Sequence, residues 1–481
     1  MVYAILNFLL LTGWSLASPP GSSPDEDLHL SSVWYLAKYP KVIDPAHPLR
    51  DDKIPLRITD SGKCYFNNPN TTSICETDNS LSDVSYSRVL NGLGLSPKYY
   101  DFLSNFVLPT RIEQSTLLLR IVNSLIASIA LFIVVLLTPR SIYIPVLVSW
   151  LIANIPLGFF ILSSVNPSSW SYIFSFIFLP LTYKVLSKDR NPNSIAITFT
   201  FLVFAFLLAR EARFDTLLFG LIFTISLLPM VFNYEQMNKK IKTLINLLTL
   251  VMALLLSLAI WNRSKLVNFR DVKTSNWENL TGVPSLITGV FGGWGLGSLE
   301  TVMPAIVFIG SFVTVISVIF TSLRKINISE LTSVILLTFF AFIVPLFVLI
   351  NSNLRVGEWF QPRYILPIFY VLIALNLILI FKTLAIRKLL IYINFLFLIS
   401  TITFITALHT VYRRYTVGLD NYSLIFREPD SWWWDFNHLP SPIITYTITV
   451  VIFIIFWFLV KKDILAESRL VSPNDSEQRR N

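Results

Sequence analysis

Apolar runs of about 20 residues recur along this chain, and they constrain its fold more than any other feature. A run of that length spans the hydrocarbon core of a bilayer as one helix. An α-helix suits that environment because it satisfies its backbone hydrogen bonds internally. The sequence therefore predicts an all-α polytopic membrane protein with about twelve transmembrane helices. The expected spans cover residues 2–18, 114–137, 142–162, 171–187, 194–210, 214–233, 243–261, 303–322, 331–350, 364–381, 389–408 and 443–460.

Composition agrees with a membrane location. Charged residues make up only 14% of the chain and hydrophobic residues 54%, whereas about 25% of a soluble protein is charged. The shortage of charge indicates that much of the surface never meets water. The net charge of +9 does not indicate nucleic-acid binding, because many basic residues lie in short loops between apolar runs.

The distribution of Lys and Arg predicts the orientation, since basic residues gather in cytoplasmic loops. Every second short loop is basic, and the loops between them hold only Arg210, Arg213, Arg355 and Arg363. We therefore expect the basic loops and both termini in the cytoplasm, with the chain in the plasma membrane. The basic set comprises Arg140, Lys184, Lys188, Arg190, Lys239, Lys240, Lys242, Arg324, Lys325, Lys382, Arg387, Lys388, Lys461 and Lys462.

This orientation places every long loop outside. The expected organisation is a first transmembrane helix at 1–18, an extracytoplasmic loop at 19–113 and a helical membrane domain at 114–460. That domain has outer loops at 262–302 and 409–442, and a polar cytoplasmic tail follows at 461–481. A cleaved signal peptide is the alternative for the first span, since Ala17 precedes Ser18. We favour a retained helix because a basic region is missing before the apolar run.

Two cysteines, Cys64 and Cys75, lie in the first outer loop. Outside the cytoplasm, such a pair favours a disulfide that closes a short loop. The alternative is a pair of free thiols. A zinc site is disfavoured because no further His or Cys lies near enough in the sequence to complete it.

A helix start follows the first span. Residues 23–26 combine a capping serine, a proline and a capping-box glutamate. Apolar residues then recur at helical spacing at Leu30, Val33, Trp34 and Ala37, which predicts a short amphipathic helix lying along the membrane surface.

Three carboxylates and a histidine share this helix start. Asp25, Glu26 and His29 fall on one helix face, with Asp27 beside them. One reading is that the acids only cap the helix and favour its dipole. The other is that they bind a metal ion or take a proton from a hydroxyl group. Their position at the water side of a large apolar body favours the second reading.

Other polar groups occupy the expected outer face. Arg210, Glu211, Arg213 and Asp215 form either a functional cluster or a self-neutralising one. Arg363, at the head of a late span, either binds a lipid phosphate or anchors its helix. The glycine-rich turn at residues 291–294 either approaches a phosphate or forms a plain re-entrant loop. The aromatic run at 430–435 suits the membrane interface.

Four short motifs resemble those of a bacterial membrane family catalogued as domain of unknown function 2142. They occur in the family's order between about residues 20 and 370. Ser169, Glu300 and Pro362 depart from the family pattern, as does the extra Gly293, and Ser169 and Pro362 put backbone roles at those turns in doubt. The motifs are Pro24-Asp25-Glu26 with His29; Asn166-Pro167-Ser168-Ser169; Phe291-Gly292-Gly293-Trp294 with Leu299-Glu300-Thr301 and Pro304; and Gln361-Pro362-Arg363-Tyr364-Ile365-Leu366-Pro367.

That family is similar to the GT-C glycosyltransferases, which use sugars carried on polyprenyl phosphates. The resemblance implies inverting transfer to a cell-envelope glycan or glycoconjugate at the outer face. Asp25 or Glu26 would be the catalytic base, with Asp27 and His29 near the acceptor or a divalent metal such as Mg²⁺ or Mn²⁺. Arg363 would bind the donor phosphate, with Arg210 and Arg213 behind it. The other site candidates are Asn166, Trp294, Glu300, Gln361 and Tyr364.

Two other classes remain open. A secondary transporter or lipid-linked-sugar flippase also has about twelve helices, but its polar site lies near the bilayer midplane, often at broken helices in matching halves. The expected spans here are nearly free of ionisable residues. A membrane acyltransferase acting on cell-wall sugars would need a catalytic histidine with an acid partner, for which His29 is the candidate.

Overall fold

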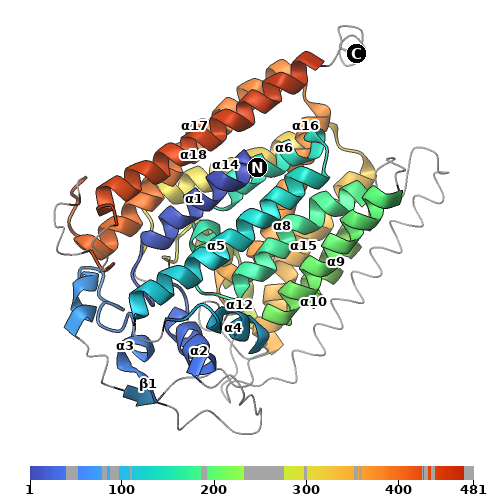
Figure 1. Cartoon of the computed structure of the whole chain (residues 1–481). Helices are drawn as coiled ribbons and strands as arrows, with labels where there is room; N and C mark the ends of the chain where they lie inside the picture. The colour runs from blue at the N-terminus through green and yellow to red at the C-terminus, as the bar shows by residue number, and fades with distance from the viewer. Residues whose placement is uncertain are drawn as a thin grey trace.

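The computed structural model describes residues 1–38, 53–78, 84–86, 97–108, 111–185, 192–231, 276–296, 301–351, 356, 360–424, 426, 432–434 and 439–470. Across this part of the chain the protein is a helical bundle (Figure 1). Seven of its described helices are long and apolar enough to cross a membrane. They are α5 (Ile112–Leu137), α9 (Pro192–Ala212), α14 (Ala305–Ser322, continued by the 3₁₀ turn η3, Leu323–Lys325), α15 (Ile328–Asn351), α16 (Leu366–Thr383), α17 (Ile386–Thr416) and α18 (Pro442–Leu470).

Further apolar helices of the described chain join the bundle: α1 (Val2–Leu16), α6 (Arg140–Ala153), α7 (Leu157–Leu162), α8 (Ser168–Val185) and α10 (Thr216–Val231). The expectation of a polytopic helical membrane protein is therefore confirmed. The expected span at 142–162 is interrupted between α6 and α7, where Pro156 cannot continue a regular helix. The expected span at 243–261 lies outside the described residues, so the count of about twelve stays a prediction.

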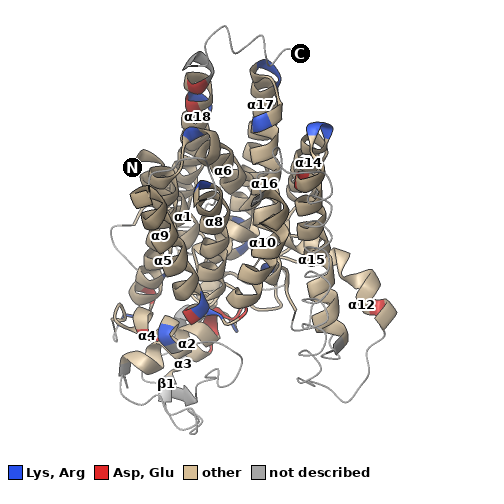
Figure 2. Cartoon of the chain, turned by 90° about the vertical axis from the view of Figure 1, so that its right-hand side faces the viewer, with Lys and Arg blue, Asp and Glu red and all other residues tan. Residues whose placement is uncertain are grey.

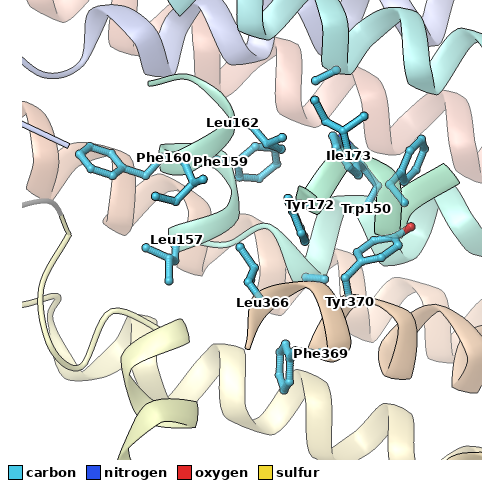
Figure 3. Close-up of a cluster of buried hydrophobic side chains, with 14 of the residues drawn as sticks. Trp150, Leu157, Phe159, Phe160, Leu162, Tyr172, Ile173, Leu366, Phe369 and Tyr370 are labelled. Carbon is cyan, nitrogen blue, oxygen red and sulfur yellow. The ribbon is translucent and has the colours of Figure 1, made fainter. Parts of the chain in front are cut away.

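Helix α16 forms the centre of the bundle. Every residue from Leu366 to Ile380 is buried, and the helix packs on α6, α8, α14 and α15. Large aromatic side chains fill the contact, including Trp150 of α6, Tyr172 of α8 and Tyr370 of α16 (Figure 3). The Tyr370 hydroxyl and the Ser149 hydroxyl share a hydrogen bond of 3.0 Å, so this core satisfies a polar group inside its apolar packing.

Outer helices turn apolar side chains away from the protein. Helix α9 exposes Ile197, Phe199, Phe204 and Leu207. A contiguous apolar face of this kind suits lipid contact rather than water. In Figure 1, α17 and α18 lie side by side, and α1 packs against α18.

The two ends of the bundle differ. Lys and Arg gather at the ends of α14, α17 and α18, whereas α2 (Glu26–Lys38), α3 (Leu56–Thr59) and α4 (Pro97–Ser104) lie at the opposite end (Figure 2). This separation agrees with the expected division between basic loops and a first loop on the other side. Which end faces the cytoplasm stays a prediction.

The first loop folds against that second end. An antiparallel pair joins β1 (Lys53–Pro55) to β2 (Val84–Tyr86), with Ile54 opposite Ser85, so the described chain is not purely helical. The 3₁₀ helix η1 (Ser73–Asp78) contains Cys75, the second cysteine of a disulfide-closed loop. The bond between Cys64 and Cys75 confirms the expected pairing, with the two Cα atoms 6.0 Å apart.

Arg414 of α17 binds the backbone of the disulfide loop. Its buried guanidinium donates to the backbone oxygens of Thr71 at 2.7 Å and Tyr65 at 2.8 Å. The disulfide therefore closes the loop, and the Arg414 hydrogen bonds attach it to α17. Two further short helices, α12 (Asn276–Gly282) and α13 (Pro284–Val290), precede α14.

Helix α2 differs from the amphipathic surface helix that the sequence predicts. It begins at Glu26, three residues after Ser23, and most of its side chains are buried within the protein. Half of the expected capping box forms, because the Ser23 N–H donates to Glu26 Oε2 at 3.4 Å. The later start follows from Asp25, whose φ of 58° is incompatible with a right-handed helix.

Candidate functional site

Asp25 lies between α1 and α2 with a left-handed backbone, φ 58°. Non-glycine residues in that region cost about 1 to 3 kcal/mol unless the surroundings hold them there. Aspartate and asparagine adopt it more readily than most residues. The side chain of Asp25 stays 46% exposed. A strained backbone that presents a carboxylate to solvent is typical of functional sites.

Arg363 forms an ion pair with Asp25, although 338 residues separate them. Arg363 lies in the 3₁₀ turn η4 (Pro362–Tyr364), directly before α16, and only 3% of its side chain is exposed. Its guanidinium also donates to Gln361 Oε1 and to the Tyr364 hydroxyl, the latter at 3.0 Å. The structure thus brings together four of the candidates: Asp25, Gln361, Arg363 and Tyr364.

A second guanidinium approaches the same tyrosine. The Cζ atoms of Arg213 and Arg363 lie 4.8 Å and 4.9 Å from the centre of the Tyr364 ring, within cation–π distance. Arg213 donates to both carboxylate oxygens of Asp215, at 3.0 Å and 2.5 Å, and to the Ser168 hydroxyl at 3.1 Å. Tyr364 therefore links two cations at one end of the bundle.

These cations set the charge state of Asp25. Burial alone would raise the pKa of the Asp25 carboxyl, but the Arg363 guanidinium opposes it, and Arg213 adds a smaller effect in the same direction as Arg363. The net result is a pKa below the ordinary value, so Asp25 is ionised at neutral pH.

Glu26 has a different environment from its neighbour. Its side chain is fully buried, and Arg120 of α5 donates to both carboxylate oxygens, at 2.9 Å and 2.5 Å. The Val165 N–H donates to the same carboxylate at 3.0 Å. Both carboxylate oxygens of Glu26 accept hydrogen bonds and neither is exposed to solvent, so Glu26 attaches the start of α2 to α5 and to the Val165 backbone.

Arg120 also closes the end of α1. It donates to the backbone oxygens of Ser15 at 2.9 Å, Ser18 at 2.7 Å and Pro19 at 2.8 Å. Carbonyls at a helix end lack partners within the helix, and a basic side chain is one way to satisfy them. The sequence interpretation missed Arg120. Its signal was a charged residue inside the expected span at 114–137, where an ionisable group needs a partner.

His29 is buried beside the site rather than open to it. Its Nδ1 shares a 2.9 Å hydrogen bond with the hydroxyl of Tyr100 in α4. Burial lowers the pKa of His29 to about 3, against a smaller opposing effect from Asp25. His29 is therefore neutral and a weak base. Asp27 lies in the first turn of α2 and is partly exposed.

Two of the remaining motifs pack against these residues. Asn166 Nδ2 donates to the backbone oxygen of Pro24 at 2.9 Å, which joins its turn to the Asp25 segment. Helix α13, which runs into the glycine-rich turn, lies against η4: a Cβ on Gly289 would meet Pro362 Cγ at 2.2 Å and Trp294 Cδ2 at 3.3 Å. Trp294 thus borders the turn that carries Arg363. Glu300 lies outside the described residues.

Arg210 belongs to a separate, more exposed arrangement. Its side chain is 43% exposed and pairs with Glu211 at 2.7 Å, and Glu211 also binds Lys98 of α4 at 3.0 Å. Among the described residues, no group of three His, Cys, Asp or Glu side chains is placed to hold a metal ion. Asp25 instead faces Arg363, and His29 faces Tyr100.

Comparison with known proteins identifies the chain at family level. The family model described as Predicted membrane protein (DUF2142) matches residues 8–372, which is more than half of the 481 residues. This chain belongs to the DUF2142 family. Asp25, Arg120, Arg213 and Arg363 all lie inside the matched part of this DUF2142 protein. No curated protein and no solved structure matches it.

Proposed function

We propose that this DUF2142 protein is a GT-C-like membrane glycosyltransferase with about twelve spans. It transfers a sugar from a polyprenyl-phosphate donor to a cell-envelope glycan or glycoconjugate at the outer face of the bacterial plasma membrane, with both termini cytoplasmic. One observation carries the proposal: an accessible carboxylate, Asp25, meets a buried guanidinium, Arg363, at one end of an apolar helical bundle.

The reaction needs both groups. The acceptor hydroxyl gives its proton to a carboxylate as its oxygen bonds to the anomeric carbon of the sugar, and the bond from that carbon to the phosphate oxygen breaks. The departing polyprenyl phosphate gains negative charge, which guanidinium groups stabilise. Asp25 is the base in this scheme, because it is the exposed member of the acidic pair.

Glu26 takes a positioning role instead. Its two oxygens are bound by Arg120, so accepting a proton would break a buried ion pair. Arg363 and Arg213 bind the donor phosphate, and their shared contact with Tyr364 keeps two positive charges close together. The side chains here do not favour a divalent cation held by the protein, because Asp25 pairs with Arg363 and His29 hydrogen-bonds to Tyr100, so the scheme assigns the charge stabilisation to the two arginines.

The competing classes fit less well. An acyltransferase needs a histidine base, whereas His29 is buried against Tyr100 and has a pKa of about 3. A transporter or flippase places its polar site near the midplane. Asp25 and Arg363 lie at helix starts, ahead of α2 and α16.

A reconstitution tests the proposed function. The purified protein in lipid vesicles is given polyprenyl-phosphate hexoses and pentoses with cell-envelope glycans, and release of free polyprenyl phosphate is measured. We expect release that depends on the acceptor and on Asp25. Folded protein that consumes none of these donors would overturn the proposal. The Arg111→Lys variant is the control for protein handling, since Arg111 is exposed at the start of α5.

A further inference from the structure

We propose that the donor phosphate and Asp25 compete for the same edge of the Arg363 guanidinium, so that lipid-phosphate binding releases Asp25. This inference rests on the proposed function, which it extends with an order of events: donor first, then base. Three observations support it, namely the unpaired donor of Arg363, the way two other arginines bind carboxylates, and the exposure of Asp25.

Arg363 has one buried donor without a partner. Nη1 donates to Gln361, and Nη2 donates to Asp25 and to the Tyr364 hydroxyl. The Nε atom is buried, and within the described part of the chain no acceptor binds it. A buried N–H without an acceptor carries a desolvation cost that no hydrogen bond offsets. An anion oxygen at Nε would remove that cost.

Two neighbouring arginines show how such an edge is filled. Arg120 uses Nε and Nη2 to hold both oxygens of Glu26. Arg213 uses Nε and Nη2 to hold Asp215. At Arg363 only one of the two donors of this edge has a partner among the described residues: Nη2 donates to Asp25, and Nε has no acceptor. A phosphate that bound this edge in the bidentate way would take Nη2 from Asp25.

Asp25 is the partner that can leave. Its carboxylate contacts Arg363 through Oδ2 and is 46% exposed, whereas Glu26 is fully buried with both oxygens bound. A carboxylate that is 46% exposed keeps part of its hydration, so Asp25 leaves its pair at a lower cost than a fully buried carboxylate would. A bidentate guanidinium–phosphate contact is stronger. Exchange therefore favours the phosphate.

The exchange has a chemical consequence. While Arg363 is paired with Asp25, it holds the pKa of that carboxyl low and makes it a weak base. Transfer of Arg363 to the phosphate leaves an ionised carboxylate with a higher affinity for protons. Asp25 then accepts the proton of the acceptor hydroxyl only when a donor is in place.

Binding of polyprenyl phosphate without sugar tests the competition and needs no turnover. The dissociation constant is measured for wild type and Asp25→Asn in lipid nanodiscs, with polyprenol as the neutral reference. Asparagine tolerates left-handed backbone, and Asp25→Gly provides a second variant with that property. We expect both variants to bind about fivefold more tightly, because they no longer occupy Arg363.

A matched control separates competition from loss of negative charge. Glu211→Gln removes a carboxylate that pairs with Arg210 and Lys98 instead of Arg363, so it should leave the dissociation constant unchanged. In an Arg363→Lys background, Asp25→Asn should no longer tighten binding. Unchanged or weaker binding by both Asp25 variants would overturn the competition alone. Wild type that binds polyprenyl phosphate no better than polyprenol would overturn the proposed function as well.

Discussion

Arg120 binds both carboxylate oxygens of Glu26, the residue next to Asp25 in the sequence. The two adjacent acids therefore have opposite environments. Glu26 is locked in the protein between α5 and the Val165 backbone, and Asp25 faces Arg363 with nearly half of its side chain exposed. Glu26 therefore fixes the position of the segment that carries Asp25.

The buried pair predicts a folding defect on removal of one charge. Glu26→Gln leaves Arg120 without a counter-charge, and breaking a buried pair in this way costs about 3 to 5 kcal/mol. We expect a large drop in melting temperature in detergent. Asp60→Asn is the control, because its pair with Lys63 is exposed and should contribute about 1 kcal/mol or less. Equal melting temperatures for the two variants would show that Glu26 is not structural.

The disulfide gives a second stability prediction. Mass spectrometry of non-reduced protein should find no alkylatable thiol at Cys64 or Cys75. Replacement of both by Ser should destabilise the protein by about 2 to 4 kcal/mol, since the loop entropy of the unfolded chain rises. Two free thiols in the purified protein would contradict the pairing.

The apolar runs predicted the helical membrane architecture well, because bilayer thickness sets the length of a span. The cysteine spacing and the position of the pair in an outer loop predicted the disulfide. Both signals are local in sequence. They need no knowledge of which helices become neighbours.

Long-range pairing could not be predicted in the same way. Asp25 and Glu26 are indistinguishable as sequence neighbours, and their partners lie in α5 and η4. The left-handed backbone at Asp25, which moves the helix start to Glu26, also depends on those tertiary contacts. The charge of Arg120 inside an apolar span was the available signal.

Buried His29 predicts a pH dependence of stability. Its folded pKa of about 3 lies below the ordinary 6.5, so protonation favours the unfolded state as pH falls below 6.5. The stability that neutral His29 contributes is fully present above pH 6.5 and is lost as the pH falls toward 3. Between about pH 7 and about pH 5, the free energy of unfolding of the wild type should fall by about 2 kcal/mol more than that of His29→Gln. If the melting temperatures of the two proteins change equally with pH over that range, His29 is not a buried neutral histidine.

Cysteine labelling tests the orientation. A cysteine placed at position 50 should react with a membrane-impermeant reagent in intact cells, because the first loop is expected outside. A cysteine at Lys388, in the first turn of α17 and among the basic residues expected in the cytoplasm, should react only after permeabilisation. The reverse pattern would invert the topology and move the Asp25 site to the cytoplasmic side.

The rate of sugar transfer by Asp25→Asn tests the central claim most directly. The amide cannot accept the proton of the acceptor hydroxyl, so we expect the rate to fall by about 100-fold or more while the melting temperature is retained. The Asp60→Asn variant, which alters an exposed ion pair near the disulfide loop, should transfer at the wild-type rate. Asp25→Asn that is folded and transfers sugar as fast as wild type would show that Asp25 is not the base.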